Sequence, residues 1–148
     1  MNSRLAHRHV LVTGAGGGIG LAIAQACAQA GAHVTAVDRA PQASDGVRGL
    51  QLLHPGTVQY LAGDVTRIAD IDAFLAAAID QSGPVHTLVN NAAVFEMAPL
   101  LEADAHSFDR LFAVNVKGMF FVMQAVLRHM VEAATPGASV INLASQAG

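Results

Sequence analysis

The sequence is short of several residue types, and each shortage excludes a class of protein. The single cysteine, Cys27, cannot form an internal disulfide, and its alanine-rich surroundings favour packing in a buried helix. Eight basic against eleven acidic side chains give a formal net charge of -3. Because no basic run is present that could follow a phosphate backbone, we expect no nucleic-acid partner.

Long hydrophobic segments are also missing. Gly, Asp, Lys or His interrupts each apolar stretch before it reaches the ~18 residues that suggest a membrane span. The N-terminal residues show no apolar leader followed by a small-residue cleavage site. The sequence therefore predicts a cytoplasmic protein with no membrane partner.

The histidine positions lack any metal-binding pattern. They include no pair at i and i+4 and no cysteine at metal-ligand spacing. We therefore predict no metal site. We interpret the seven histidines as surface or helix-end residues: His7, His9, His33, His54, His86, His106 and His129.

Apolar residues, in contrast, are abundant. They make up 53% of the 148 residues even without glycine, above the roughly 45–50% that is usual with glycine included. The length is that of one ordinary domain, and two full domains would not fit. The composition predicts a single α/β domain whose sheet is covered on both faces.

Strand-like and helix-like segments alternate along the chain. Short β-rich runs cover residues 9–14, 32–38, 57–64, 85–91 and 138–144. Helical spacing covers residues 19–31, 68–79 and about 104–134, the last as one helix or as two end to end. Residues 39–56 are expected to form a loop with one short helix. This alternation predicts a doubly wound parallel sheet.

The most informative segment is VTGAGGGIGLAIAQ, residues 12–25. After a strand, the backbone can turn sharply, approach a diphosphate and begin a helix only where no side chain intervenes. Gly14, Gly18 and Gly20 are spaced for this task. The spacing is T-G-x-x-x-G-x-G and not the generic G-x-G-x-x-G. The alternative is a glycine-rich turn that binds nothing.

This loop, with its Ile19, resembles the nucleotide loop of the short-chain dehydrogenase/reductase family. Two further segments carry the resemblance: Asp64-Val65 is similar to the family's adenine-contacting pair, and residues 90–93, NNAA, resemble its NNAG motif. Ala93 stands where the family has glycine, which costs stability only if its φ is positive. The resemblance implies a Rossmann domain over residues 1–148, with a cofactor site at Gly14, Gly18, Ile19, Gly20, Asp38, Asp64, Val65, Asn90 and Ala92.

The choice of cofactor depends on Asp38, which ends the second predicted strand. Its distance from the glycine loop is close to the ~20 residues expected of a ribose-binding acid. A carboxylate there can accept both ribose hydroxyls and would repel a 2′-phosphate. We therefore predict NAD and not NADP. Arg39 is the complication, since it can attract that phosphate or lie solvated at the surface.

Two residues are the candidates for catalysis. Asn115, in an apolar helical segment, resembles the family asparagine that helps hold a water in a proton relay. The alternative is a core amide bonded to its own neighbours. Residues 142–145, NLAS, resemble the family's N-x-x-S segment, so Ser145 corresponds to the catalytic serine. Alternatively, the Ser145 side chain hydrogen-bonds backbone groups at the end of its strand, and Asn90 and Asn91 have the same alternative role at theirs.

The family's catalytic tyrosine and lysine have no match in the sequence. The resemblance places a Y-x-x-x-K motif about a dozen residues after Ser145, beyond Gly148. Tyr60 and Lys117, the only tyrosine and lysine, lie 117 − 60 = 57 positions apart and cannot form it. We interpret Tyr60 as a core residue. We expect the 148 residues to be a Rossmann domain that is incomplete after the fifth strand and inactive alone.

The resemblance implies an NAD-dependent oxidoreductase that acts on a small-molecule alcohol or ketone. Residues 90–100 and 141–148 are most similar to sorbitol and other polyol dehydrogenases of the family. The second interpretation as an enzyme is a ketoacyl- or ketosteroid-type reductase. A catalytically inactive NAD-binding module or a truncated gene product is the competing class. A homo-oligomer is expected for the full-length protein.

Overall fold

The computed structural model describes residues 4–145, whose five strands form one parallel sheet in the order β3-β2-β1-β4-β5. The strands are β1 (His9–Thr13), β2 (His33–Asp38), β3 (Val58–Ala62), β4 (Thr87–Asn90) and β5 (Ser139–Asn142). β1 lies in the centre, and the chain builds outward on one side before it crosses to the other. The predicted doubly wound parallel sheet is confirmed.

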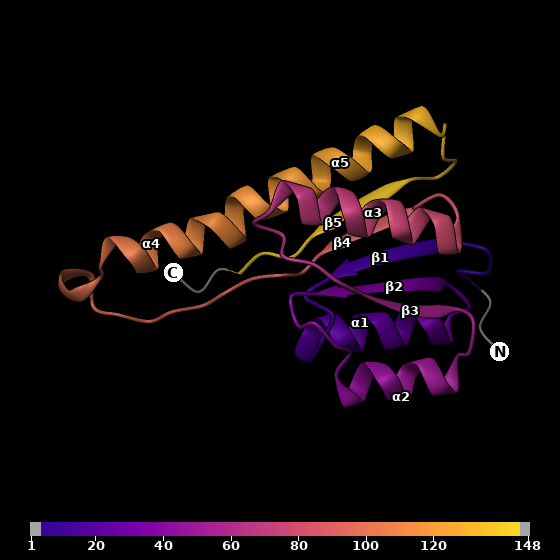
Figure 1. Ribbon diagram of the computed structural model, residues 1–148, viewed down its shortest axis with the longest axis horizontal. Helices are drawn as coiled ribbons and strands as arrows, with labels where there is room; N and C mark the ends of the chain where they lie inside the picture. Colours follow the sequence, from indigo (N-terminus) through magenta and orange to yellow (C-terminus); the bar gives the residue numbers. More distant parts are fainter. Residues whose placement is uncertain (1–3, 146–148) are drawn as a thin grey trace.

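Helices cover both faces of this sheet (Figure 1). α1 (Gly18–Gln29) and α2 (Asp45–Leu53) lie on one side, and α3 (Ile68–Ser82) and α5 (Met119–Glu132) lie on the other. The ends of α1 and α3 follow the expected signals, because Gly31 and Gly83 take positive φ angles of 92° and 75° just after them. The short helix expected within residues 39–56 is α2, capped by the Ser44 hydroxyl, which accepts a bond from the Val47 amide.

The core consists of two apolar layers, one on each face of the sheet. Alternation along β1 sends Val10 and Val12 toward α1 and Leu11 toward α3 and α5. All five residues of β1 are buried, as expected for a central parallel strand. The high apolar content of the sequence is therefore used on both faces.

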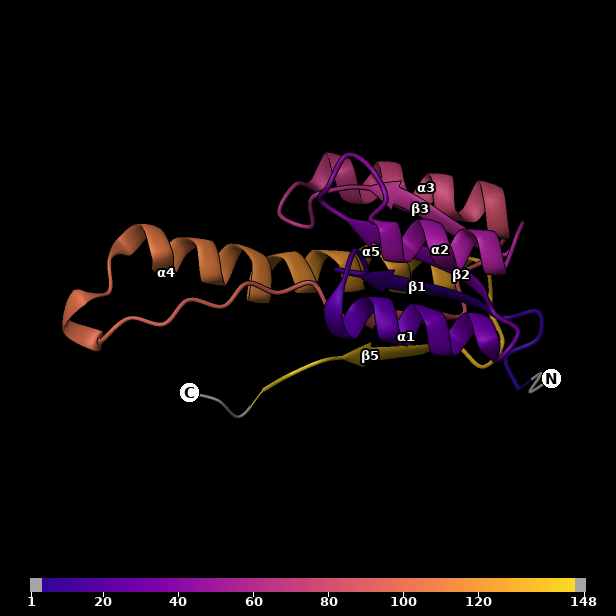
Figure 2. The same ribbon diagram turned by 90° about the horizontal axis from the view of Figure 1, so that it is seen from below.

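The helical pattern over residues 104–134 forms one continuous stretch. α4 (Ala105–Phe112) passes through a π-helical turn (Ala113–Gly118) into α5, and the 3-10 turn Leu100–Glu102 precedes it. Figure 2 shows α4 and the loop after β4 projecting together beyond the sheet. By length and composition alone, Ala105–Glu132 could cross a membrane, contrary to the expectation from the interrupted apolar runs. Within this stretch α5 buries Val122, Val126 and Met130 in the core, whereas Phe112, Phe120 and Val131 are exposed.

His9 corrects the interpretation of the histidines as surface or helix-end residues. It lies inside β1 and is only 1% exposed. Its Nδ1 lies 2.8 Å from the Gly83 carbonyl oxygen, which can only accept, so Nδ1 carries the proton. Its Nε2 then accepts from the Thr35 hydroxyl, also at 2.8 Å. Burial is the main cause that lowers the pKa of His9 to about 4, so the ring is neutral at pH 7.

Candidate nucleotide-binding site

The glycine loop connects β1 to α1 and needs its glycines for two physical reasons. Gly14 and Gly18 have φ angles of 65° and 53°, a region that other residues rarely adopt. A Cβ on Gly14 would also lie 2.7 Å from the Ala92 Cα, and one on Gly20 would overlap the Gly14 carbonyl oxygen. The loop therefore leaves a surface of backbone at the start of α1, where amide N–H groups and the helix dipole favour an anion.

Thr13 and Asn91 hold this loop against the end of β4. The Thr13 hydroxyl oxygen accepts bonds from the Asn91 and Ala92 amides, both at 3.1 Å. The Asn91 side-chain amide donates to the Thr13 and Gly14 carbonyls at 3.1 and 3.0 Å. The candidate residues inferred from the sequence did not include Thr13, although the threonine of the T-G pattern was the available signal.

Ala93 adopts no left-handed conformation, because the positive-φ residues other than glycine within residues 4–145 are His7 and Ala134. The added Cβ at this departure from the family motif therefore strains no backbone. Asn90 lies beneath the site and is 5% exposed. Its amide donates to the Asn142 side-chain oxygen at 2.9 Å, which links β4 to β5.

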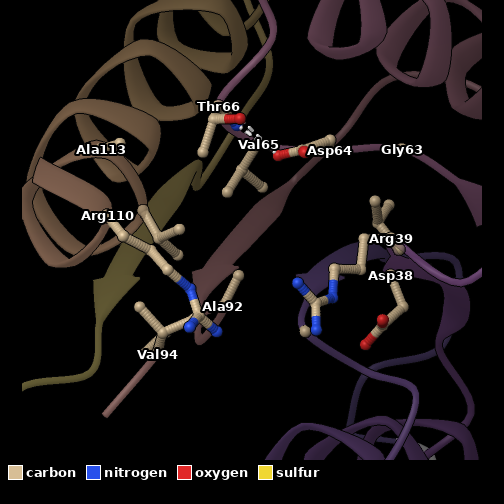
Figure 3. Close-up of a pocket in the computed structure, with 14 residues that line it drawn as sticks. Asp38, Arg39, Gly63, Asp64, Val65, Thr66, Ala92, Val94, Arg110 and Ala113 are labelled. Carbon is tan, nitrogen blue, oxygen red and sulfur yellow. Dashed lines mark hydrogen bonds between the residues drawn. The ribbon is translucent and has the colours of Figure 1, made fainter. Parts of the chain in front are cut away.

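Asp38 ends β2 with its carboxylate directed at the glycine loop. Its Oδ2 accepts a bond of 2.9 Å from the Gly16 amide, and the Ala40 amide lies 3.4 Å from its Oδ1. A Cβ on Gly16 would come within 2.7 Å of Oδ2, so the contact requires glycine there. The side chain of Arg39, the next residue, extends into the same pocket (Figure 3).

Asp64 and Val65 form the opposite wall, just after β3. The Thr66 amide and hydroxyl both donate to one Asp64 carboxylate oxygen, at 2.8 and 2.7 Å. The Asp64 amide in turn donates to Asp70 at 3.0 Å. A Cβ on Gly118 would come 2.9 Å from the Val65 side chain, so glycine lets the π-helical turn pack closely against this corner.

These walls enclose a pocket of about 360 Å³ at the carboxyl ends of the strands. Of the predicted cofactor residues, those that line it are Gly14, Asp38, Asp64, Val65 and Ala92. Gly18, Gly20 and Asn90 are not among its lining residues, and Ile19 is 66% exposed on the first turn of α1. The pocket straddles β1 and β4, where the strand order reverses, which is the usual ligand position in such sheets.

Arg110 is a lining residue for which the sequence provided no signal. It belongs to α4, and its guanidinium faces the pocket beside Val94 (Figure 3). Glu96, in the loop after β4, pairs with it. The pairing is non-local, because it depends on how α4 lies against that loop. No group of three or more potential metal ligands was found among residues 4–145.

The two catalytic candidates belong to the long helix and to the segment after β5, and neither is among the residues that line the pocket. Asn115 lies in the π-helical turn, and its side chain makes two hydrogen bonds of 2.8 Å to the backbone of Val94. The Asn115 side-chain amide donates to the Val94 carbonyl, and the Asn115 side-chain oxygen accepts from the Val94 N–H. The bonded-amide alternative thus describes its side chain, while its relay role stays a prediction. Ser145 is exposed and follows β5, which lies beside β4 in register Asn90 to Asn142. Its catalytic role also stays a prediction.

Comparison with known families decides the identity of this arrangement. Residues 8–148 match the family model described as short chain dehydrogenase. The chain belongs to the short-chain dehydrogenase/reductase family. The resemblance to this family is thereby confirmed, and the roles expected for the glycine loop, Asp64-Val65 and the NNAA segment stay predictions.

Several relatives within this family are dehydrogenases of sugar alcohols. The chain is 43% identical over 145 residues to sorbitol dehydrogenase of Cereibacter sphaeroides and covers 55% of that protein. It is 40% identical over 145 residues to galactitol 2-dehydrogenase of Agrobacterium fabrum, again covering 55%. Both alignments use 98% of this chain. The chain therefore spans about half the length of the curated relatives it matches.

Solved structures of the family share the fold. A 3-ketoacyl-(acyl-carrier-protein) reductase from Brucella melitensis, complexed with NADH, is 31% identical, with a TM-score of 0.85 over 95% of this chain and 58% of that one. A glucose/ribitol dehydrogenase from the same organism is 25% identical, with a TM-score of 0.87 over 99% of this chain and 60% of that one. The sheet order and flanking helices are thus those of short-chain dehydrogenases.

Proposed function

We propose that this chain binds NAD at the carboxyl edge of its sheet and forms the cofactor-binding part of an NAD-dependent oxidoreductase. The main support is the position of the Asp38 carboxylate, whose Oδ2 accepts a hydrogen bond of 2.9 Å from the Gly16 amide of the glycine loop. A fixed carboxylate there suits two ribose hydroxyls and repels a 2′-phosphate. The close packing of the loop that this proposal needs is supported by Gly14 and Gly20, where an added Cβ would collide with the backbone of Ala92 and of Gly14.

Each part of the site has one task in this proposal. The backbone after Gly14 and the start of α1 bind the diphosphate, Asp38 binds the ribose, and Asp64-Val65 bind the adenine. Bound at these residues, NAD would supply the hydride-accepting group for oxidation of the alcohol carbon. Ser145 would hydrogen-bond the reacting oxygen, and Asn115 would help to hold a water of the proton relay. The group that takes the proton from the alcohol would be the family's tyrosine, which these 148 residues do not include.

The proposed substrate is a secondary alcohol of the polyol class, such as sorbitol, or the corresponding ketone. Support comes from the sorbitol and galactitol dehydrogenases among the relatives. A ketoacyl-type reductase is the second candidate, because the NADH-complexed structure similar to this chain is an enzyme of that kind. A cytoplasmic location and a homo-oligomeric full-length protein remain predictions.

The test of the cofactor proposal is the binding of NADH to the 148-residue chain, followed by the nucleotide's own fluorescence. We expect Gly14→Asp to weaken binding about 100-fold or more, because it brings an unpaired carboxylate to the diphosphate in a left-handed backbone conformation. Gly49→Ala is the matched control, since the added Cβ meets nothing within 4 Å on α2. Circular dichroism verifies folding. A folded wild-type chain that does not bind NADH would contradict the proposal.

The substrate class needs a separate assay. With a Tyr-Lys pair of the family type supplied after Gly148, we expect NAD reduction with sorbitol or galactitol. Oxidation of no polyol, together with reduction of ketoacyl thioesters, would favour the second candidate.

A further inference from the structure

Tyr60 lies where a core interpretation does not fully account for it. Its ring, on β3, packs against the apolar layer under α1 and α2, as expected. Its hydroxyl, however, leaves that layer and donates to the Ala40 carbonyl, just beyond the end of β2. The same hydroxyl lies 3.4 Å from the carbonyl oxygen of Asp38. The only tyrosine of the sequence thus contacts the backbone on both sides of Arg39.

Residues 38–40 carry the proposed ribose-binding carboxylate. The Ala40 amide lies 3.4 Å from Asp38 Oδ1, and the Gly16 amide donates to Oδ2. The Asp38 carbonyl also accepts from the Gly63 amide at 2.9 Å, which continues the pairing between the two strands. Ala40 is therefore tied by its N–H to the carboxylate and by its carbonyl to Tyr60. The Tyr60 hydroxyl is the side-chain group that anchors this turn from outside it.

The hydroxyl is suited to a permanent donor role. Partial burial, and then the nearby negative charge of Asp38, raise the pKa of Tyr60 above its ordinary value. It therefore keeps its proton throughout the neutral range. A carbonyl needs a donor, so the direction of the bond to Ala40 is not ambiguous.

We propose that Tyr60 is a positioning residue that sets the orientation of Asp38 and Arg39, and with it the preference for a free ribose 2′-hydroxyl over a 2′-phosphate. This inference rests on the proposed function. Arg39 makes the nucleotide preference sensitive to the position of this turn, because its guanidinium extends into the same pocket beside the Asp38 carboxylate (Figure 3). While the turn is held, Asp38 faces the ribose. When the turn is loosened, the carboxylate can withdraw and the guanidinium can pair with a phosphate.

The test is the ratio of the dissociation constants for NADPH and NADH, measured on wild type and on Tyr60→Phe. We expect the ratio to fall about three- to tenfold in the variant, the range typical for loss of one hydrogen bond. Thr57→Val is the matched control, because Thr57, just before β3, also donates a hydroxyl bond to a backbone carbonyl, that of His54, and this bond does not involve residues 38–40. The control is expected to keep the wild-type ratio.

A double-mutant cycle separates positioning from general destabilisation. If Tyr60 acts through Asp38, Tyr60→Phe should change the ratio less than about twofold in an Asp38→Asn background. A loss of stability alone would weaken the binding of both nucleotides by the same factor and leave the ratio of dissociation constants unchanged. An unchanged ratio in the variant would therefore overturn the inference. If Tyr60→Phe does not fold, Tyr60→Met removes the same hydroxyl with a more adaptable side chain.

The two proposals fail in different ways. Absence of NADH binding by folded wild type would overturn the proposed function, and this inference with it. NADH binding by wild type, with an unchanged ratio in folded Tyr60→Phe, would overturn this inference alone.

Discussion

The centre of the sheet and its β5 edge differ sharply in packing. β1, in the middle, is buried along its whole length, and β2 beside it is nearly so. β5, at the opposite edge from β3, has Ile141 51% exposed, and α4 contains no buried residue. The cause is the distribution of helices, since α1 and α2 cover the strands on the β3 side while β5 receives no such cover on that face.

This difference divides the candidate site. Of the residues proposed for the nucleotide, Gly14 follows buried β1 and Asp38 ends β2, where neighbours on both faces restrict the backbone, whereas Asp64 and Val65 follow β3, an edge strand that is only partly buried. The residues proposed for catalysis, Asn115 and Ser145, come from the long helix and from the strand at the exposed edge. The contrast suggests that cofactor geometry is set by the core of the domain, and catalytic geometry by the less covered side.

The largest effect should come from removing core volume at the centre of the sheet. Leu11→Ala deletes a fully buried side chain from β1 and is expected to lower the free energy of unfolding by about 2–5 kcal/mol. Ile141→Ala, in half-exposed β5, should cost about 1 kcal/mol. Denaturant unfolding of both variants measures the difference. Equal losses would show that the comparison is wrong.

A smaller effect is expected from acid, acting through His9. Its pKa is lowered from the ordinary 6.5 to about 4, by burial first and then by the nearby charges of His33, His86 and His129. The unfolded chain therefore binds this proton more readily than the folded chain. Stability from this group is fully present above pH 6.5, and it is lost as the pH falls toward 4, by at most about 3 kcal/mol.

The measurement is the free energy of unfolding between pH 7 and pH 4 for wild type and for His9→Gln. The variant should show a shallower loss over this range. His106→Gln, at an exposed position on α4, is the control and should keep the wild-type slope. A wild-type slope in His9→Gln would contradict the assignment.

The smallest effect concerns the less covered side. Asn115→Ala removes both bonds to Val94 and is expected to cost about 1–2 kcal/mol, because two backbone groups lose their partners. Hydrogen exchange at the Val94 amide should accelerate, while exchange at the Val12 amide should not. Asn115→Asp keeps an oxygen that can accept from the Val94 N–H, so its exchange rate at Val94 should fall between those of wild type and Asn115→Ala. Unchanged exchange at Val94 would mean that the helix does not hold this loop.

Local patterns were sufficient for much of the fold. The strands lie within the β-rich runs that were expected but are shorter: β1 ends at Thr13, just before Gly14, and β3 ends at Ala62, before Asp64. The helix ends at Gly31 and Gly83 follow from backbone preferences that neighbouring residues express by themselves. The structure places the Asp38 carboxylate at the glycine loop, as its spacing along a β-α-β unit implies, while its role in binding the ribose stays a prediction.

Other features depended on contacts between distant segments and had no local signal. His9 meets Thr35 across two paired strands, and Arg110 meets the pocket only through the path of α4. The Tyr60 hydroxyl reaches Ala40 because β2 and β3 pair in one register out of several possible.

The sequence by itself determined the alternation of strands and helices, the family, and the residue types at the nucleotide loop, because these depend on periodicity and on the backbone freedom of glycine. Only the tertiary structure decided which side chains surround Asp38, which histidine is buried, and which end of the sheet is exposed. The physical reason is that hydrogen-bond partners and burial are properties of residues brought together across the sheet, and strand register and helix placement decide which residues those are.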